Sequence, residues 1–420
     1  MTLNAGSATE RQSSIEGLAY TSLQPQVKEY LVANQQLLAM LVQMLKSNVS
    51  NNPSTFGILT IFANLTAYRP TMTEEQKKMS QLKSYANAAK PADENPLDDD
   101  KHVTLRCRKV LDIGLMPALM TNAKAQSPTL LSISIGIVHA LAKEQKHRGT
   151  MAQQGAVKLL VQSLDKFQTA AKPPSGIEVP SRLASHALAR ILISVNPTHV
   201  FTSALPASSA LRPLLSLLTQ DPDAETRDLL PTFESLLALT NLASMQDNTI
   251  RDAIISTSFQ QIEDLLLSSN TLIQRAAVEL ICNLMASPSG VAKFADGSSQ
   301  AKNRLHVLLA LADVEDLATR RAAGGALAML TEWDAAVEAV LSKERGVRIL
   351  LGMCGDESDE MRHRGVACLL NVVAAPGEVG KKGVERVKAE GGVEVVRGVV
   401  MKSRSKEVLA LGVEVLKKLV

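Results

Sequence analysis

Asparagine side chains supply the chemistry that is most prominent in this sequence. Asn241 lies in the run FESLLALTNLAS, from Phe233 to Ser244, which is otherwise apolar and has helical spacing. Burying an amide without partners is costly, so this side chain should make hydrogen bonds. Because an amide both donates and accepts, it could stabilise the turn between neighbouring helices or hold the backbone of a bound extended segment. The residues leave both roles open.

The same position recurs along the chain. We call it the ladder slot, and aligning the sequence on it gives Asn64, Ala140, Arg190, Asn241, Asn283, Met329, Asn371 and Val415. The successive steps are 76, 50, 51, 42, 46, 42 and 44 residues. A period of about 40–47 residues is typical of armadillo and HEAT repeats.

The elements that position these side chains follow from that period. We predict an all-α fold, an armadillo/HEAT-like right-handed superhelical solenoid of roughly eight helical repeats. The ladder slot would lie on the third helix of each repeat, and the stacked third helices would line a concave groove. A second landmark is a glycine before an apolar helix start, where a sharp turn is expected, at Gly114, Gly155, Gly346 and Gly392.

The first step, from Asn64 to Ala140, is longer than the repeat period by about 30 residues, which indicates an inserted segment. Residues 70–104 are poor in apolar residues and rich in Pro, Asp, Glu and Lys. We predict a charged loop there, with a short helix around Glu74 to Ala89. It is either a solvated connection or a loop that contacts a partner. Residues 1–11 are predicted to be flexible, and residues 12–420 to form the repeat domain.

Composition and motifs disfavour several other classes of protein. Aromatic residues make up 3% of the chain, which suits stacked helices better than sandwiches or barrels. The net charge is +3, from 45 basic and 42 acidic residues, so no nucleic-acid partner is expected. The N-terminus lacks a signal-peptide core and no run reaches the length of a membrane span, so we expect no membrane contact and a cytoplasmic location.

Catalytic and metal-binding patterns are weak in this sequence. The four cysteines form no C-x-x-C pair and are expected to be buried thiols: Cys107, Cys282, Cys354 and Cys368. No two of the seven histidines have the i, i+4 spacing of a helical metal pair. The segment GEVGKKGVER at Gly377–Arg386 lacks the spacing of a phosphate-binding loop. We therefore expect no enzyme activity, no cofactor and no metal.

Several long blocks resemble one family. SIEGLAYTSLQPQVKEYL, GILTIFANLTAYRP, RCRKVLDIGLMPAL, FESLLALTNLAS and IQRAAVELICNLM are similar, in this order, to the UCS domain of myosin-directed chaperones. The resemblance extends from about residue 12 to the C-terminus. It implies a protein that binds the myosin motor domain in the concave groove and helps it to fold, assemble or survive stress.

The resemblance also implies where binding occurs. Asn241 would lie on the groove, with Arg275 and Asn283 on the next repeat, and Asn64 and Asn371 at equivalent slots. Tyr68 and Arg69 would lie at the mouth of the inserted loop. The slot becomes Met329 and Val415 in two late repeats, where the groove could be packing alone or a cap.

Some family members carry an N-terminal tetratricopeptide domain that recruits a cytosolic ATP-driven heat-shock chaperone. The chain shows no such domain, so only indirect cooperation with that chaperone is expected.

Two other hypotheses remain open. The chain could be a different armadillo-repeat scaffold or adaptor that binds extended segments of another partner. Nuclear-import receptors pair their asparagines with a tryptophan one turn earlier, whereas the only tryptophan here, Trp333, is out of that register. The Val-rich C-terminal stretch could cap the stack or pair with a second copy to form a homodimer.

Overall fold

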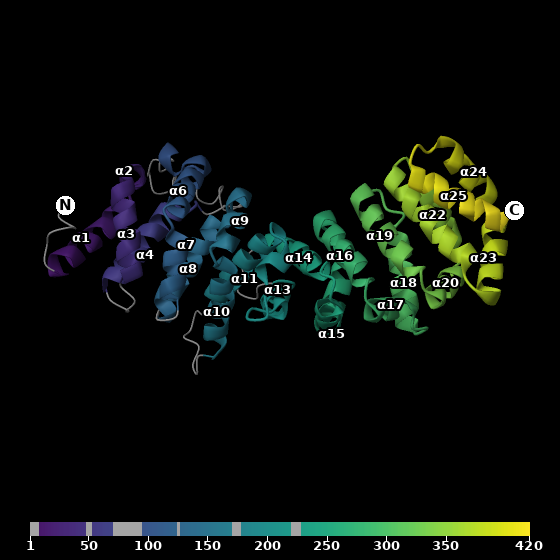
Figure 1. The fold of residues 1–420 in the computed structure, drawn as a ribbon, viewed down its shortest axis with the longest axis horizontal. Helices are drawn as coiled ribbons and strands as arrows, with labels where there is room; N and C mark the ends of the chain where they lie inside the picture. The colour runs from purple at the N-terminus through teal and green to yellow at the C-terminus, as the bar shows by residue number, and fades with distance from the viewer. Residues whose placement is uncertain (1–7, 48–52, 70–94, 124–126, 170–177, 220–227) are drawn as a thin grey trace, which may run out of the picture. The chain divides into compact units, whose positions relative to one another are not determined.

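The computed structural model describes residues 8–47, 53–69, 95–123, 127–169, 178–219 and 228–420. These residues fall into two compact units, Met1–Leu217 and Leu218–Val420, which we describe separately. Helices dominate both units (Figure 1). Outside the helices, the described residues contain one isolated antiparallel bridge, between Thr202 and Leu205. The predicted all-α class is confirmed.

The first unit contains helices that mostly pack against neighbours one repeat away in the sequence. Four of them, α1, α4, α8 and α11, form a packed row in which each helix contacts the next. The elements of this unit are α1 (Ala8–Thr21), α2 (Pro25–Ala33), α3 (Gln35–Ser47), α4 (Pro53–Thr66), η1 (Pro96–Asp98), α6 (Asp100–Asp112), α7 (Leu115–Asn122), α8 (Pro128–Leu141), α9 (Gln145–Gln153), α10 (Ala156–Thr169), α11 (Glu178–Ile193), α12 (Pro197–Val200), η2 (Ala207–Ala210) and α13 (Leu211–Ser216).

The second unit repeats the same arrangement. Its packed row is α14, α16, α19, α22 and α25, each in contact with the next (Figure 1). The elements are α14 (Leu230–Ala243), α15 (Asn248–Leu265), α16 (Thr271–Leu284), α17 (Pro288–Ala295), α18 (Ser299–Leu311), α19 (Leu317–Leu330), α20 (Asp334–Leu341), α21 (Gly346–Cys354), α22 (Asp359–Ala374), α23 (Gly377–Ala389), α24 (Gly392–Lys402) and α25 (Lys406–Leu419).

Every predicted ladder slot falls near the C-terminal end of a helix in one of these rows, which we call the ladder helices. The slots lie on α4, α8 and α11 in the first unit and on α14, α16, α19, α22 and α25 in the second. The apolar residues before each slot are buried, as with Ile281 and Leu284 on either side of Asn283. The armadillo-type repeat is thus confirmed within each unit.

The predicted glycine turns have two different physical causes. Gly114 and Gly155 have φ values of 82° and 92°, in the left-handed region that favours glycine. Gly346 is the first residue of α21, and a Cβ there would lie 2.3 Å from the carbonyl oxygen of Val340. Glycine at this position is needed for close approach of two helices. The left-handed residue near the last landmark is Gly391, one position before the predicted one.

The inserted segment is shorter than predicted at its C-terminal end. The loop was expected to end at residue 104, but η1 forms at 96–98 and α6 begins at Asp100. The Asp99 side chain caps α6 by accepting a hydrogen bond from the His102 amide, so this part of the acidic run starts a helix. The predicted helix from Glu74 to Ala89 lies outside the described residues. At the N-terminus, α1 already begins at Ala8, inside the segment predicted to be flexible.

None of the helices in the described ranges is both long enough and apolar enough to cross a membrane.

Candidate functional site

The asparagines of the ladder slots join consecutive ladder helices. In the second unit, Asn283 Nδ2 on α16 donates to the carbonyl oxygen of Thr240 on α14, at 2.9 Å. Asn371 Nδ2 on α22 makes the equivalent bond to the carbonyl of Ala328 on α19, at 3.3 Å, and lies 3.2 Å from Thr331 Oγ1. Both acceptors are in the last turn of a helix; the Thr240 carbonyl also accepts the Ser244 N–H, at 3.1 Å, and the Ala328 carbonyl accepts from Thr331 Oγ1.

The first unit uses the same contact. Asn64 Nδ2 donates to the Ala19 carbonyl at 3.2 Å and to Ser22 Oγ at 2.9 Å, which joins α4 to α1. For Asn283 and Asn371 the acceptor carbonyl belongs to the residue just before the previous ladder slot. By this rule Tyr20 occupies an earlier slot on α1, which the sequence alignment missed because tyrosine resembles none of the other slot residues.

An arginine replaces the asparagine in one repeat of the first unit. Arg190 occupies the slot of α11, and its Nη1 lies 3.3 Å from Nε2 of His139, the residue before the slot of α8. The same His139 nitrogen lies 3.2 Å from His186 Nδ1. The slot therefore keeps its link to the preceding ladder helix through a longer side chain.

Of the two roles predicted for the slot asparagines, the link between repeats is confirmed at Asn64, Asn283 and Asn371. Their side chains remain half-exposed. Within the described part of the chain, the side-chain oxygens of these three residues accept no hydrogen bond. The nitrogen stabilises the fold, and the oxygen has no partner within the described residues. Asn241 lies at the slot of α14 and is also half-buried, and its role in binding stays a prediction.

Arg275 lies two turns before Asn283 on α16, on an adjacent stripe of the helix. Its side chain is 32% exposed, and its Nε lies 3.9 Å from Glu279 Oε1, which is an ion pair without a hydrogen bond. Burial raises the pKa of the Glu279 carboxyl, although Arg275 acts in the opposite direction.

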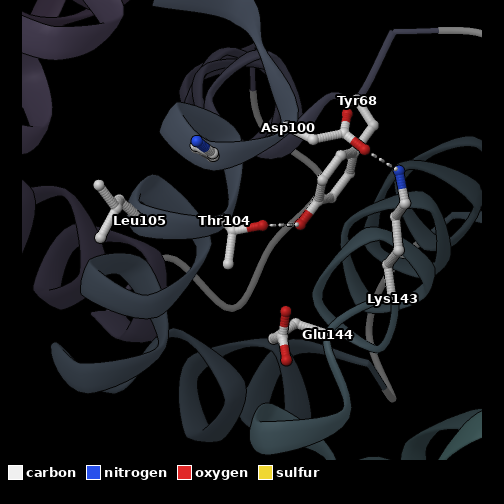
Figure 2. A pocket seen from close by; sticks show the side chains of 7 residues that line it. Tyr68, Asp100, Thr104, Leu105, Lys143 and Glu144 are labelled. Atoms are coloured by element: carbon white, nitrogen blue, oxygen red, sulfur yellow. Dashed lines mark hydrogen bonds and ion pairs between the residues drawn. The ribbon is translucent and has the colours of Figure 1, made fainter.

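Tyr68 and Arg69 hold the start of the inserted segment against the first unit. The Tyr68 hydroxyl lies 3.1 Å from Thr104 Oγ1 on α6, and Lys143 Nζ lies 3.9 Å from the centre of the tyrosine ring (Figure 2). Lys143 Nζ is also 3.0 Å from Asp100 Oδ2. Burial raises the pKa of the Tyr68 phenol, so the hydroxyl stays protonated at physiological pH. Arg69 donates to the Asn95 carbonyl at the far end of the segment.

A cavity of about 570 Å³ opens beside Tyr68, between α6 and the turn from α8 to α9. Figure 2 shows Thr104 and Glu144 among its lining side chains, with Leu105 at its edge. Leu105 is 57% exposed, which is unusual for a large apolar residue. Positive and negative groups in this lining are closely matched, so the cavity has no marked preference for a charged ligand.

Arg106 is a residue of this region that the sequence analysis overlooked. Its side chain is 0% exposed, and it donates to the carbonyls of Leu65 and Leu97, at 3.1 and 2.6 Å. It also pairs with Glu29 at 2.8 Å and Asp98 at 3.0 Å. Leu65 precedes the inserted segment and Leu97 follows it, so one guanidinium holds both ends. The available signal was its helical register with the apolar Val103 and Val110.

The seven predicted binding residues are divided between the two units. Asn64, Tyr68 and Arg69 belong to the first unit, whereas Asn241, Arg275, Asn283 and Asn371 belong to the second. Within the second unit the slots of α14, α16 and α22 share one row of ladder helices. These residues have the hydrogen-bonding groups needed to hold an extended chain.

Groups suited to catalysis are not assembled in the described residues. All four cysteines are free thiols. Burial raises the pKa of Cys107 and of Cys368 to about 12, so neither forms an effective nucleophile near neutral pH. Within the described ranges no group of three or more His, Cys, Asp or Glu side chains could hold a metal ion.

Comparisons with known proteins identify several proteins and solved structures that are similar to this chain. No family model matches it. Ring assembly protein 3 of Schizosaccharomyces pombe is 33% identical over 392 residues, which is 92% of this chain and 50% of that protein. The structure of UNC-45 from Drosophila melanogaster matches 99% of this chain and 50% of that one, at 26% identity and a TM-score of 0.79.

A third match concerns the fold alone. The structure of the myosin chaperone UNC-45 from C. elegans in complex with a Hsp90 peptide has a TM-score of 0.79 and 23% identity, over 99% of this chain and 42% of that one. The chain thus spans about half the length, or less, of the relatives it matches.

Proposed function

We propose that the chain is a member of the UCS-domain family of myosin-directed chaperones, and that it binds the myosin motor domain and promotes its folding, stability and action on actin. The observation that carries the proposal is the 33% identity to Ring assembly protein 3 along 92% of the chain. The fold-level match to the myosin chaperone UNC-45 agrees with it.

The mechanism would be passive and based on hydrogen bonds to the backbone of the bound segment. Extended or loosely folded parts of the motor would lie along the ladder helices. The side-chain oxygens of Asn283 and Asn371 would accept N–H groups of that segment, since their nitrogens are already used within the fold. Any ATP-driven cycle would belong to a partner such as a cytosolic heat-shock chaperone, which cooperates indirectly.

An armadillo-repeat scaffold for another partner is the second candidate. The same backbone-binding groups would serve an extended segment of any sequence. The tryptophan ladder of nuclear-import receptors has no counterpart, since Trp333 precedes α20, which is not a ladder helix. A homodimer through the C-terminal helices would be compatible with either function.

The test is a thermal aggregation assay of a purified myosin motor domain, run beside an unrelated aggregating client. We expect selective protection of myosin, and Asn283→Ala should weaken it at temperatures where the variant is still folded. The lost bond to Thr240 should lower stability by only about 1 kcal/mol. Asn303→Ala is the matched control, because Asn303 is exposed on α18, outside the row of ladder helices.

Each other outcome has a definite meaning. Equal protection of both clients would indicate a general holdase. If myosin is neither protected nor retained in a pull-down, the chaperone proposal fails and the scaffold candidate replaces it. If Asn283→Ala unfolds the second unit, the asparagine is structural and its binding role is refuted.

A further inference from the structure

Arginines on three consecutive ladder helices of the second unit form a basic stripe beside the asparagine slots. We call Arg275 on α16, Arg321 on α19 and Arg364 on α22 the arginine stripe. Their side chains are 32%, 40% and 25% exposed. Two other arginines nearby, Arg320 and Arg362, are already paired with Asp356 and Asp359 at 3.0 and 2.8 Å.

The stripe has one acidic residue between two of its members. Glu360 lies 2.6 Å from Arg364 Nη2 through one carboxylate oxygen and 3.2 Å from Arg321 Nε through the other. One carboxylate therefore serves two guanidinium groups, so Arg321, Arg364 and Glu360 together carry a net positive charge. Glu360 itself is 49% exposed, so its ion pairs with Arg321 and Arg364 are weakened by solvent and can be displaced by another carboxylate.

Hydrogen-bond donors in the stripe remain unused. Arg321 Nε is sealed from solvent but makes no hydrogen bond, because its N–H is not aligned with the nearby Glu360 oxygen. Arg275 pairs loosely with Glu279, at 3.9 Å, and interacts with Asp316 through charge alone, and it makes no hydrogen bond to any residue in the described ranges. A guanidinium offers five N–H donors in a fixed fork that matches a carboxylate.

Arg364 packs against the backbone of α19 beside Arg321. A Cβ at Gly325 would lie 3.6 Å from the Arg364 guanidinium carbon, and one at Gly324 would lie 2.8 Å from the end of Met353. The Arg364 side chain lies in ordinary contact distance of both glycines and reaches α19, where it donates to the Arg321 carbonyl. The spacing of the stripe is therefore fixed by packing across two helices.

We propose that the arginine stripe binds an acidic, extended segment of a partner protein, whose carboxylates displace Glu360 from Arg321 and Arg364. Glu360 acts as an internal competitor that partly neutralises Arg321 and Arg364 when no partner is bound. This inference deepens the proposed function by naming the charge of the bound segment. It rests on the proposed function only in taking the myosin motor as the protein that contains this segment.

The test uses short peptides, which makes it independent of myosin. The probe is a fluorescein-labelled, unstructured 12-residue peptide with four glutamates, compared by fluorescence polarisation with glutamine and lysine versions. We expect the glutamate peptide alone to bind, and more weakly as salt is raised from 50 to 300 mM. Glu360→Gln should tighten binding about two- to fivefold, since an exposed ion pair no longer competes.

Substitutions in the stripe should have the opposite effect. Arg321→Gln combined with Arg364→Gln should weaken binding at least about tenfold, because charge-assisted hydrogen bonds are lost. Arg321→Gln alone should weaken it less and guards against misfolding of the double variant, whose melting temperature is measured in parallel. Arg348→Gln is the control, since Arg348 lies on α21, outside the ladder row, and is 68% exposed.

The outcomes separate the two proposals. Binding that is equal for the glutamate and glutamine peptides, or unchanged by Glu360→Gln, overturns the acidic-segment inference even if myosin is protected. Selective binding of the glutamate peptide that falls with the stripe variants supports it, even if myosin is not protected. In that case the acidic segment comes from a different partner.

Discussion

Replacing Arg106 with methionine should destabilise the first unit more than any exposed substitution on the same helix. Arg106 is fully buried and donates to two backbone carbonyls and two carboxylates. Methionine fills a similar volume but donates nothing. The carbonyls of Leu65 and Leu97 would lose a partner, at about 1–3 kcal/mol for each that stays buried.

The carboxylates add less than the carbonyls. Asp98 keeps its ion pair with Lys28, at 3.0 Å. Glu29 is 35% exposed and can recover hydration. We therefore expect a loss of about 3–5 kcal/mol, the range for breaking one side of a buried ion pair. Domains are stable by about 5–15 kcal/mol, so the first unit should weaken severely.

Urea denaturation followed by circular dichroism, together with amide hydrogen exchange, measures this effect. Exchange resolves the two units, which need not unfold together. Protection should fall first at residues 65–69 and 95–98, the two ends held by Arg106. Arg108→Met is the control, because Arg108 is on the same helix, 71% exposed, and loosely paired with Asp112 at 3.8 Å. Equal losses in the two variants would refute the reasoning.

Two further predictions concern packing and pH. Gly346→Ala should destabilise the second unit, because the added Cβ would lie 2.3 Å from the Val340 carbonyl oxygen. Gly352→Ala, in the same helix, adds a Cβ with no atom within contact distance and should stabilise the unit by up to about 1 kcal/mol. Thermal unfolding of the two variants measures both effects, and equal shifts in melting temperature would contradict the prediction. Raising the pH above about 9 should lower stability, since the unfolded thiols ionise there while the pKa of Cys107 and of Cys368 is about 12 in the fold. Urea unfolding at pH 7.5 and 9.5 should show a smaller pH-dependent loss in Cys368→Ala than in the parent chain, and an identical loss in both would disprove it.

The sequence predicted the repeat because periodicity is a local property. Every slot from Asn64 to Val415 was found near the end of a ladder helix, since the apolar spacing before it fixes which face is buried. The slot contacts were harder to predict, because they join residues about 43 positions apart, as with Asn283 and Thr240. The four partners of Arg106 were hidden for the same reason, since they lie on both sides of the inserted segment.

The position of the slot explains why asparagine recurs there and why some repeats omit it. A ladder helix ends with carbonyls that lack a full set of N–H partners, and the next ladder helix packs against that end. A donor of the right reach at the slot adds a hydrogen bond to one of these carbonyls, as Asn64 and Asn371 do. Met329 and Val415 cannot donate, so these two slots lack that link.

In the second unit, the slot nitrogens bond within the fold and the slot oxygens do not, and this determines which groups are available to a bound chain. The slot nitrogens of Asn283 and Asn371 point to the fold, which leaves acceptor oxygens along one stripe of the ladder helices. Arg275 makes no hydrogen bond and presents its guanidinium donors along the adjacent stripe. An extended chain presents N–H and C=O groups along its length and places successive side chains on opposite faces. Such a chain could give its N–H groups to the asparagines and its acidic side chains to the arginines, and so bind through backbone and charge together.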